Sequence, residues 1–222
     1  AMSDSVDWEA ALKGLGTDFT IEQITQKNHA ACGHVHAIID AINQIKEEKD
    51  FDPEAIEKIN IGSYQKVLEI CCNPKPATTY EAKFSAQFCA ALACLKGRAL
   101  RTQDFLQDSL KDPAVASLMP KVELNIDQDC QKAFPGARSA KVKVELQNGI
   151  ELESFAPTRK GDPDCPMSDF ELSEKYTDLA QSVLGKERAR ALLEDTWMLD
   201  KVNSTREFVE KYFDEGTKYS KN

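Results

Sequence analysis

All three histidines of the 222-residue chain, His29, His34 and His36, lie in one stretch that begins at Lys27, so any histidine chemistry is confined to it. Imidazole groups can act as general bases at neutral pH, and a lysine beside them can bind a carboxylate or phosphate. Apolar side chains then recur at helical spacing, at Val35, Ile38, Ile39, Ile42 and Ile45. We therefore predict an amphipathic helix that opens near Gly33.

The start of this helix should attract an anion, because a helix N-terminus presents free backbone N–H groups and the positive end of the peptide dipole. We predict that the anion binds at the turn of His34 and His36, together with Lys27. His36 falls on the polar face of the helix with Asp40 and Asn43. The dipole should lower the pKa of a histidine there and keep its imidazole neutral, as a general base requires. The competing interpretation is a helix cap of solvated polar residues without a function.

Other reactive residue types give weaker signals. A metal site built from the three histidines is disfavoured, since His34 and His36 do not share a helical face. Cys71 and Cys72 are interpreted as ordinary packing residues, because vicinal thiols cannot easily join. Lys83 is interpreted first as a surface or helix-pairing lysine and second as a ligand, since the helix around it is otherwise apolar.

Composition excludes several classes of function. The formal net charge is −9 and the basic residues are scattered, which argues against nucleic-acid binding. No apolar run approaches the length of a membrane span, so we expect no membrane association. Seven cysteines without paired Cys-x-x-Cys spacing argue against a disulfide framework or a zinc ribbon and favour reduced thiols in the cytoplasm. There is no Gly-rich phosphate loop, and we expect no cofactor.

The elements that must position the histidine stretch predict an α+β fold. A small antiparallel sheet is expected, with the histidine helix and a helix from Thr79 to Lys96 on one face. Its strands are predicted at Ile59–Ile61, Val122–Ile126, Val142–Leu146 and Ile150–Glu153. Asn148-Gly149 between the last two is a strong hairpin signal. After a Pro- and Gly-rich loop, helices are predicted at Asp169–Leu184, Lys186–Asp200 and Thr205–Phe213, with Ser168 and Glu171 as a capping box before the first. Asp112-Pro113 is predicted to start a short helix with Asp112 as its N-cap, and residues 19–25 are predicted to be extended.

Six short segments occur in one order along nearly the whole chain. They are Leu15-Gly16; Lys27 with Cys32-Gly33, His36 and Ile39-Asp40-Ala41; Glu81-Ala82-Lys83-Phe84-Ser85; Asp112-Pro113-Ala114-Val115; Asn148-Gly149; and Lys160-Gly161-Asp162-Pro163 with Pro166-Met167-Ser168-Asp169. In this order the segments resemble the C-terminal half of the MmgE/PrpD family. Its members are lyases and isomerases that include 2-methylcitrate dehydratase, cis-aconitate decarboxylase and iminodisuccinate epimerase.

The resemblance implies a two-domain enzyme, with a large helical domain that is mostly N-terminal and a smaller α+β lid. We expect residues 1–26 to be a connecting segment, residues 27–160 to be the lid, and residues 161–222 to be helices that return to the helical domain. That missing N-terminal domain would supply further catalytic residues, and the site would lie between the two domains. The apolar faces left open by its absence also lead us to expect a homodimer.

The resemblance also implies site residues. Lys27 matches the family's active-site lysine, and His36 matches a histidine at the helix start. Cys32 stands where the cis-aconitate decarboxylase branch has a catalytic histidine, so either His29 or His34 substitutes for it or the chemistry differs. The family's tyrosine falls on Ile70, with Tyr64 and Tyr80 only nearby. Both departures argue against decarboxylation of cis-aconitate. We predict catalytic roles for Lys27, His34 and His36, and substrate-binding roles for His29, Cys32, Gly33 and Lys83.

Two functions of different classes follow. The first is the C-terminal part of a lyase or isomerase that removes a proton alpha to a carboxylate of a small di- or tricarboxylate and needs its helical domain for activity. The second is a non-catalytic module that uses the same site to bind an anion.

Overall fold

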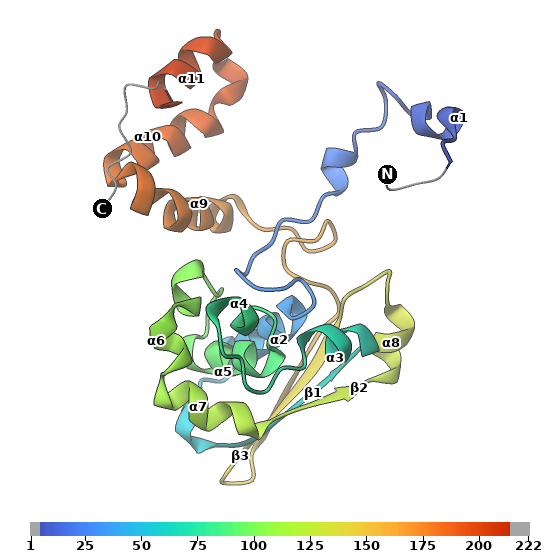
Figure 1. Ribbon diagram of the computed structural model, residues 1–222, viewed down its shortest axis with the longest axis vertical. Helices are drawn as coiled ribbons and strands as arrows, with labels where there is room; N and C mark the ends of the chain where they lie inside the picture. The colour runs from blue at the N-terminus through green and yellow to red at the C-terminus, as the bar shows by residue number, and fades with distance from the viewer. Residues whose placement is uncertain (1–4, 214–222) are drawn as a thin grey trace.

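A computed structural model describes residues 5–213, and a four-stranded mixed sheet forms the centre of the main α/β layer within them (Figure 1). The strands are β1 (Ile56–Ser63), β2 (Val122–Ile126), β3 (Ala140–Leu146) and β4 (Glu151–Ala156), in the spatial order β2-β1-β3-β4. The predicted α+β class is confirmed. No helix in the described part of the chain is long and apolar enough to span a bilayer.

One strand does not run as expected. β3 is antiparallel to β1 and to β4, but β2 is parallel to β1, with Ile59 opposite Val122. The prediction of a purely antiparallel sheet is therefore wrong. The physical reason is the long connection between β1 and β2, which carries several helices and returns the chain to the end where β1 began. The predicted hairpin is confirmed: Gly149 has φ +81°, and its N–H donates to the Leu146 carbonyl oxygen at 2.8 Å.

Two helices cover one face of the sheet. Helix α2 (His36–Glu48) packs against β3 and β4, and α5 (Ala86–Lys96) packs against α2 and β2. The core between these layers consists of aliphatic side chains from both helices and from the inward positions of the strands. The predicted helix from Thr79 to Lys96 is interrupted: α4 (Thr79–Ala82) ends early, and the Ser85 hydroxyl then caps α5 by accepting from the Phe88 N–H at 3.0 Å.

Short helices connect these layers. They are α3 (Gln65–Cys71), η3 (Thr102–Phe105), α6 (Gln107–Leu110), α7 (Pro113–Leu118), η4 (Met119–Lys121), α8 (Gln128–Ala133) and, before β1, η2 (Pro53–Ala55). The Asp112 carboxylate caps α7 as its Asp-Pro start predicts, by accepting from the Ala114 N–H at 2.9 Å. Helix α8 was not expected from the sequence, and it becomes important because it precedes an arginine of the candidate site.

The two ends of the chain leave the α/β layer together (Figure 1). The Gln26 N–H donates to the Gly161 carbonyl oxygen at 2.8 Å, and the Thr25 hydroxyl donates to the Asp162 carboxylate at 2.7 Å. The N-terminal segment carries α1 (Trp8–Leu12) and η1 (Thr20–Gln23), where an extended piece was expected between 19 and 25. The C-terminal segment carries α9 (Asp169–Leu184), α10 (Lys186–Trp197), η5 (Leu199–Lys201) and α11 (Thr205–Phe213). The Ser168 and Glu171 capping box at the start of α9 is confirmed.

Both end segments expose large apolar side chains. Those in the first are Val6, Trp8, Leu12, Leu15, Phe19, Ile21 and Ile24, and those in the second include Phe170, Leu179, Val183, Trp197, Val209 and Phe213. Trp197 keeps 47% of its surface exposed, although its indole N–H donates to the Ser173 hydroxyl at 3.1 Å. Exposed apolar surface of this extent is typical of a face that packs against another protein surface.

The pairing of the two end segments predicts a large difference between two glycine substitutions. Gly161 and Gly149 both have positive φ, +96° and +81°, but a Cβ at Gly161 would overlap the Gln26 carbonyl oxygen, whereas Gly149 has open space around it. We expect Gly149→Ala to cost about 1 kcal/mol of unfolding free energy through backbone strain. Gly161→Ala should cost at least about 2 kcal/mol more. Urea denaturation measures both, and equal losses would show that the two segments are not paired.

Candidate functional site

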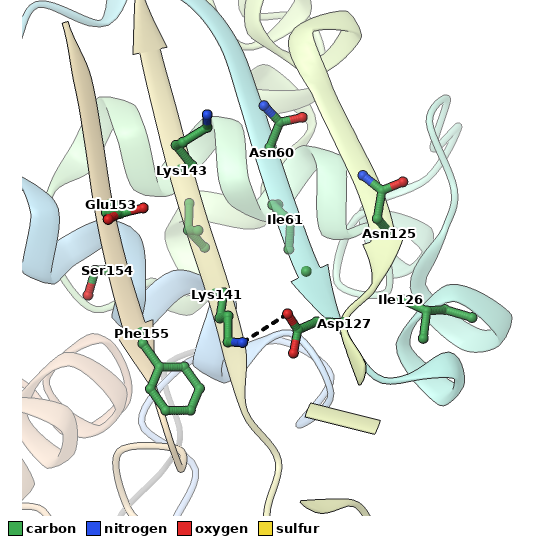
Figure 2. Close-up of a pocket in the computed structure, with 12 residues that line it drawn as sticks. Asn60, Ile61, Asn125, Ile126, Asp127, Lys141, Lys143, Glu153, Ser154 and Phe155 are labelled. Carbon is green, nitrogen blue, oxygen red and sulfur yellow. Dashed lines mark ion pairs between the residues drawn. The ribbon is translucent and has the colours of Figure 1, made fainter. Parts of the chain in front are cut away.

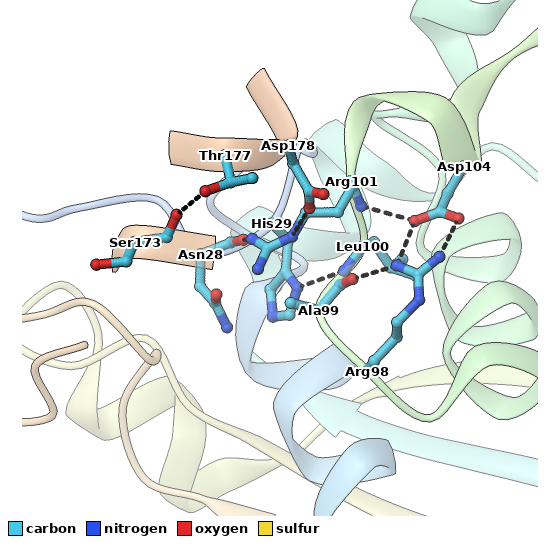
Figure 3. Close-up of polar contacts among 10 residues, drawn as sticks. All are labelled: Asn28, His29, Arg98, Ala99, Leu100, Arg101, Asp104, Ser173, Thr177 and Asp178. Carbon is cyan, nitrogen blue, oxygen red and sulfur yellow. Dashed lines mark hydrogen bonds and ion pairs between the residues drawn. The ribbon is translucent and has the colours of Figure 1, made fainter. Parts of the chain in front are cut away.

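His29 anchors the histidine stretch from inside the protein. Its Nδ1 accepts the Leu100 N–H at 3.1 Å (Figure 3), so its proton lies on Nε2, which donates to the Asp40 carboxylate at 2.9 Å. The other Asp40 oxygen accepts the Lys160 N–H at 2.9 Å. Because both ring nitrogens are used and the ring is buried, His29 holds three segments together. This geometry does not support the predicted contact of His29 with substrate.

The loop that meets His29 is itself held firmly by ion pairs. Arg98 and Asp104 form two hydrogen bonds, at 2.7 and 2.9 Å, and the same carboxylate accepts the Arg101 N–H at 2.7 Å (Figure 3). The Arg101 guanidinium donates to the Asn28 carbonyl oxygen at 3.0 Å and pairs with Asp178 of α9 at 2.9 Å. The backbone just before the candidate site is therefore fixed from two sides.

His36 is not where the sequence places it. The prediction of a polar-face position is wrong: the side chain is 1% exposed, its Nε2 donates to the Ala31 carbonyl oxygen at 3.3 Å, and its ring packs edge-on against His29 with centroids 4.9 Å apart. The segment before α2 folds back over this first helical turn and covers it. Burial is the main cause that lowers the pKa of His36 to about 3. The ring is neutral as expected, but it has no access to the surface.

The half-buried turn Cys32-Gly33-His34 is the accessible part of the stretch. The Cys32 N–H donates to the Lys83 carbonyl oxygen at 2.8 Å, so Lys83 holds the turn through its backbone. The Lys83 ammonium instead lies 6.0 Å from the centroid of the Phe105 ring. This position agrees with the helix-pairing interpretation of Lys83 rather than with the predicted contact to substrate.

A tyrosine meets His34 at this turn. The His34 Nδ1 and the Tyr64 hydroxyl are 2.8 Å apart, and the Tyr64 ring stacks on Phe134 at 4.4 Å. Burial raises the pKa of Tyr64, so its hydroxyl stays protonated. Burial, followed by the charges of Arg138 and Arg159, lowers the pKa of His34 and favours the neutral imidazole. Tyr64 directly follows β1, and this position at a strand end was the available sequence signal.

The Cys32 thiol is the second reactive group of the turn. A hydrogen bond from the Cys71 thiol is the main cause that lowers the pKa of Cys32, with further lowering by the His34 N–H and by the charges of Lys27 and Arg138. The same hydrogen bond raises the pKa of Cys71, so Cys32 is the thiol of this pair that ionises more readily. The interpretation of Cys71 as ordinary packing misses this contact.

Three cations surround the turn, and two of them have no counter-ion in the described residues. Lys27 is exposed, and its ammonium contacts only the Ala31 carbonyl oxygen, at 3.4 Å. Arg138 forms no ion pair within residues 5–213. Arg159, in contrast, is buried and forms a fork with Asp162 at 2.5 and 3.0 Å. Its other nitrogen lies 3.5 Å from the Gly33 carbonyl oxygen, where a Cβ on Gly33 would come within 2.7 Å of it.

The arrangement provides a neutral imidazole, a thiol of lowered pKa and two cations without a carboxylate partner in the described residues, all near one turn. Such groups can bind a carboxylate and move a proton next to it. Within the described residues no group of histidine, cysteine or acidic side chains could hold a metal ion.

A hollow of about 610 Å³ lies elsewhere, on the sheet face away from the two core helices (Figure 2). Its lysines are already paired: Lys141 contacts Asp127 at 3.0 Å and Asp129 at 2.7 Å, and Lys143 contacts Glu151 at 3.0 Å. An anion would have to displace these carboxylates, so this face does not match the anion-binding site predicted from the sequence.

The burial of His36 predicts acid sensitivity. The unfolded histidine takes up a proton below its ordinary pKa of about 6.5 while the folded one does not, so this stability is present above that pH and is lost as the pH falls toward the folded pKa of about 3. Between pH 6 and 4 the group should remove about 1.4 kcal/mol of unfolding free energy per pH unit. His36→Gln keeps a donor for Ala31 and should flatten this slope in urea titrations, more than His34→Gln does. Equal slopes in the wild type and in His36→Gln would contradict the buried placement.

Comparisons with known proteins agree with the resemblance seen in the sequence. The MmgE/PrpD C-terminal domain matches residues 29–199. The chain is 26% identical over 197 residues to the cis-aconitate decarboxylase-like protein oryM of Aspergillus oryzae, covering 83% of the chain and 39% of that protein. It is 22% identical over 214 residues to cis-aconitate decarboxylase of Aspergillus terreus, covering 91% of the chain and 43% of that protein. The chain thus spans less than half the length of these relatives. It belongs to the MmgE/PrpD family and carries the family's C-terminal domain.

Proposed function

We propose that this chain is the C-terminal part of an MmgE/PrpD lyase or isomerase that acts on a small di- or tricarboxylate. The family match and the two relatives named as cis-aconitate decarboxylase proteins support a lyase-type role. The observation that carries the proposal is the pair of uncompensated cations, Lys27 and Arg138, beside the neutral His34 and the Cys32 thiolate. A dianionic or trianionic substrate needs such cations, and removal of a proton next to its carboxylate needs such a base.

The proposed roles divide between binding and proton transfer. Lys27 is the cation that receives a substrate carboxylate, because it is exposed and has no acidic partner within the described residues. His34 removes the proton alpha to a carboxylate through Nε2, for which no partner is found in residues 5–213. For this step Nδ1 carries the imidazole proton and donates to the Tyr64 oxygen, so the lone pair of Nε2 is free. The imidazolium that forms keeps the Tyr64 hydrogen bond.

Cys32 distinguishes this chain from the decarboxylase branch as the resemblance describes it. A thiolate here is a weaker hydrogen-bonding partner than an imidazolium and adds negative charge next to the substrate. We propose that the reaction is dehydration or epimerisation by proton abstraction rather than decarboxylation of cis-aconitate. His29 and His36 serve this site from behind, by fixing the backbone of the turn.

The active enzyme needs a helical domain that the described residues do not contain. The joint exit of the two end segments and their exposed apolar side chains support a domain that packs between them. In its absence we propose that a second copy of the chain covers the same faces, as a homodimer. All seven cysteines are free thiols, which supports the cytoplasm as the compartment.

The proposal is tested by turnover of 2-methylcitrate and cis-aconitate with the isolated chain and with the chain joined to an MmgE/PrpD helical domain. The isolated chain should be inactive, because one wall cannot supply both the acid and the base in position. In the joined enzyme, His34→Gln should lower kcat by about 10²–10⁴-fold with little change in KM. Lys27→Ala should raise KM as well as lower kcat, because it removes substrate binding.

Lys111→Ala is the matched control, since Lys111 is an exposed lysine without an ion pair in the described part of the chain. It should behave like the parent. Turnover by the repurified isolated chain would refute the need for a second domain. Parent-like kinetics of both site variants would refute the roles proposed for Lys27 and His34.

A further inference from the structure

Arg138 lies in the connection between α8 and β3, and its backbone is held close to the candidate site. The Ser63 hydroxyl donates to the Ser139 carbonyl oxygen at 2.8 Å, and both serines are buried. The pairing of Gly62 with Lys141 continues the antiparallel run of β1 and β3 toward this point. The chain at Arg138 therefore runs beside the segment that begins at Tyr64.

A partly buried arginine usually has hydrogen-bond and ion-pair partners, and the Arg138 guanidinium lacks them in the described part of the chain. It forms no ion pair with a described residue, and its buried Nε has no hydrogen-bond acceptor. Arg159 shows the usual arrangement, since its donors reach Asp162, Thr25 and the Gly33 carbonyl oxygen. A partly buried cation with an unused N–H is costly unless an acceptor arrives from outside.

The charge of Arg138 points to where that acceptor would lie. It acts on both polar side chains of the turn and on the Tyr64 hydroxyl that contacts His34. It lowers the pKa of Cys32 and of His34, and it lowers the pKa of Tyr64 against the larger effect of burial. The charge of Lys27 also acts on Cys32. The two uncompensated cations thus share the thiol as a neighbour, at a turn where the backbone is fixed.

We propose that Arg138 binds one carboxylate of a di- or tricarboxylate substrate through its guanidinium fork, while Lys27 binds a second carboxylate across the Cys32–His34 turn. This inference rests on the proposed function and adds a residue that sets specificity for substrates with two separated carboxylates. A guanidinium matches both oxygens of a carboxylate, which fixes the orientation of the substrate as well as its position. The carbon between the two carboxylates would then lie over His34.

The test uses the 222-residue chain and two alkylating reagents that differ in one carboxylate. In both reactions the thiolate sulfur forms a C–S bond and displaces iodide, but iodoacetate carries a carboxylate and iodoacetamide does not. Peptide mass spectrometry gives the rate ratio at Cys32 and, in the same sample, at the exposed Cys72. A change in the pKa of Cys32 affects both reagents alike, so the ratio reports carboxylate binding alone.

We expect iodoacetate to be favoured over iodoacetamide at Cys32 but not at Cys72, and citrate to suppress the preference. Arg138→Gln should reduce the ratio of iodoacetate to iodoacetamide rates at Cys32 by about 10-fold or more, because it removes a charge-assisted hydrogen bond to the carboxylate. Arg138→Lys should retain part of it. Arg190→Gln is the control, because Arg190 is an exposed arginine that pairs with Glu194 on α10; it should leave the ratio unchanged.

An unchanged ratio in Arg138→Gln, a ratio insensitive to citrate, or a Cys32 inert to both reagents in the native chain would overturn the proposal. Kinetics of the joined enzyme distinguish a failure of this inference from a failure of the proposed function. If the joined enzyme is active and Arg138→Gln leaves its KM unchanged, Arg138 does not bind the substrate, and the proposed enzymatic function still stands. If the joined enzyme has no lyase or isomerase activity but its alkylation ratio at Cys32 responds to citrate, the carboxylate site stands and the proposed enzymatic function fails.

Discussion

The candidate site depends on one buried imidazole, because His29 joins the histidine stretch to the two loops behind it. Its Nδ1 accepts the Leu100 N–H and its Nε2 donates to Asp40, whose second oxygen accepts the Lys160 N–H. Loss of this ring would leave one oxygen of the part-buried Asp40 carboxylate and the buried Leu100 N–H without partners, each a cost of about 1–3 kcal/mol. The position of the Cys32–His34 turn follows from these bonds. His29, for which the sequence predicts a contact with substrate, therefore has a structural role.

Local signals in the sequence predicted local structure well. The hairpin at Gly149, the Asp112 cap and the Ser168 capping box each depend on a few neighbouring residues, and all are confirmed. The parallel direction of β2 and the break at Ser85 were missed, since both depend on where a distant segment returns. The burial of His36 was missed for the same reason: helical periodicity gives the face of a residue, but the covering segment precedes the helix.

The same limit applies to the residues of the site. Lys27, Cys32 and His34 lie within eight positions of one another and could be found from the sequence. Tyr64 and Arg138 reach this turn only because β1 and β3 pair beside it. Charge also distinguishes the site residues from the rest of the chain. The chain is acidic, with a net charge of −9. A partly buried arginine such as Arg138, with no carboxylate partner among the described residues and a buried Nε without an acceptor, is therefore a specific feature.

The central claim is that the turn of Cys32 to His34, with Arg138, forms a wall that receives a carboxylate. Chemical-shift mapping of the ¹⁵N-labelled chain during titration with citrate tests it most directly. The account predicts saturable shifts at the Gly33 and His34 amides and at the Arg138 Nε–H, with little change at Lys141 and Lys143 on the outer sheet face. Shifts confined to that outer face, or no saturable shift at the turn, would contradict the account.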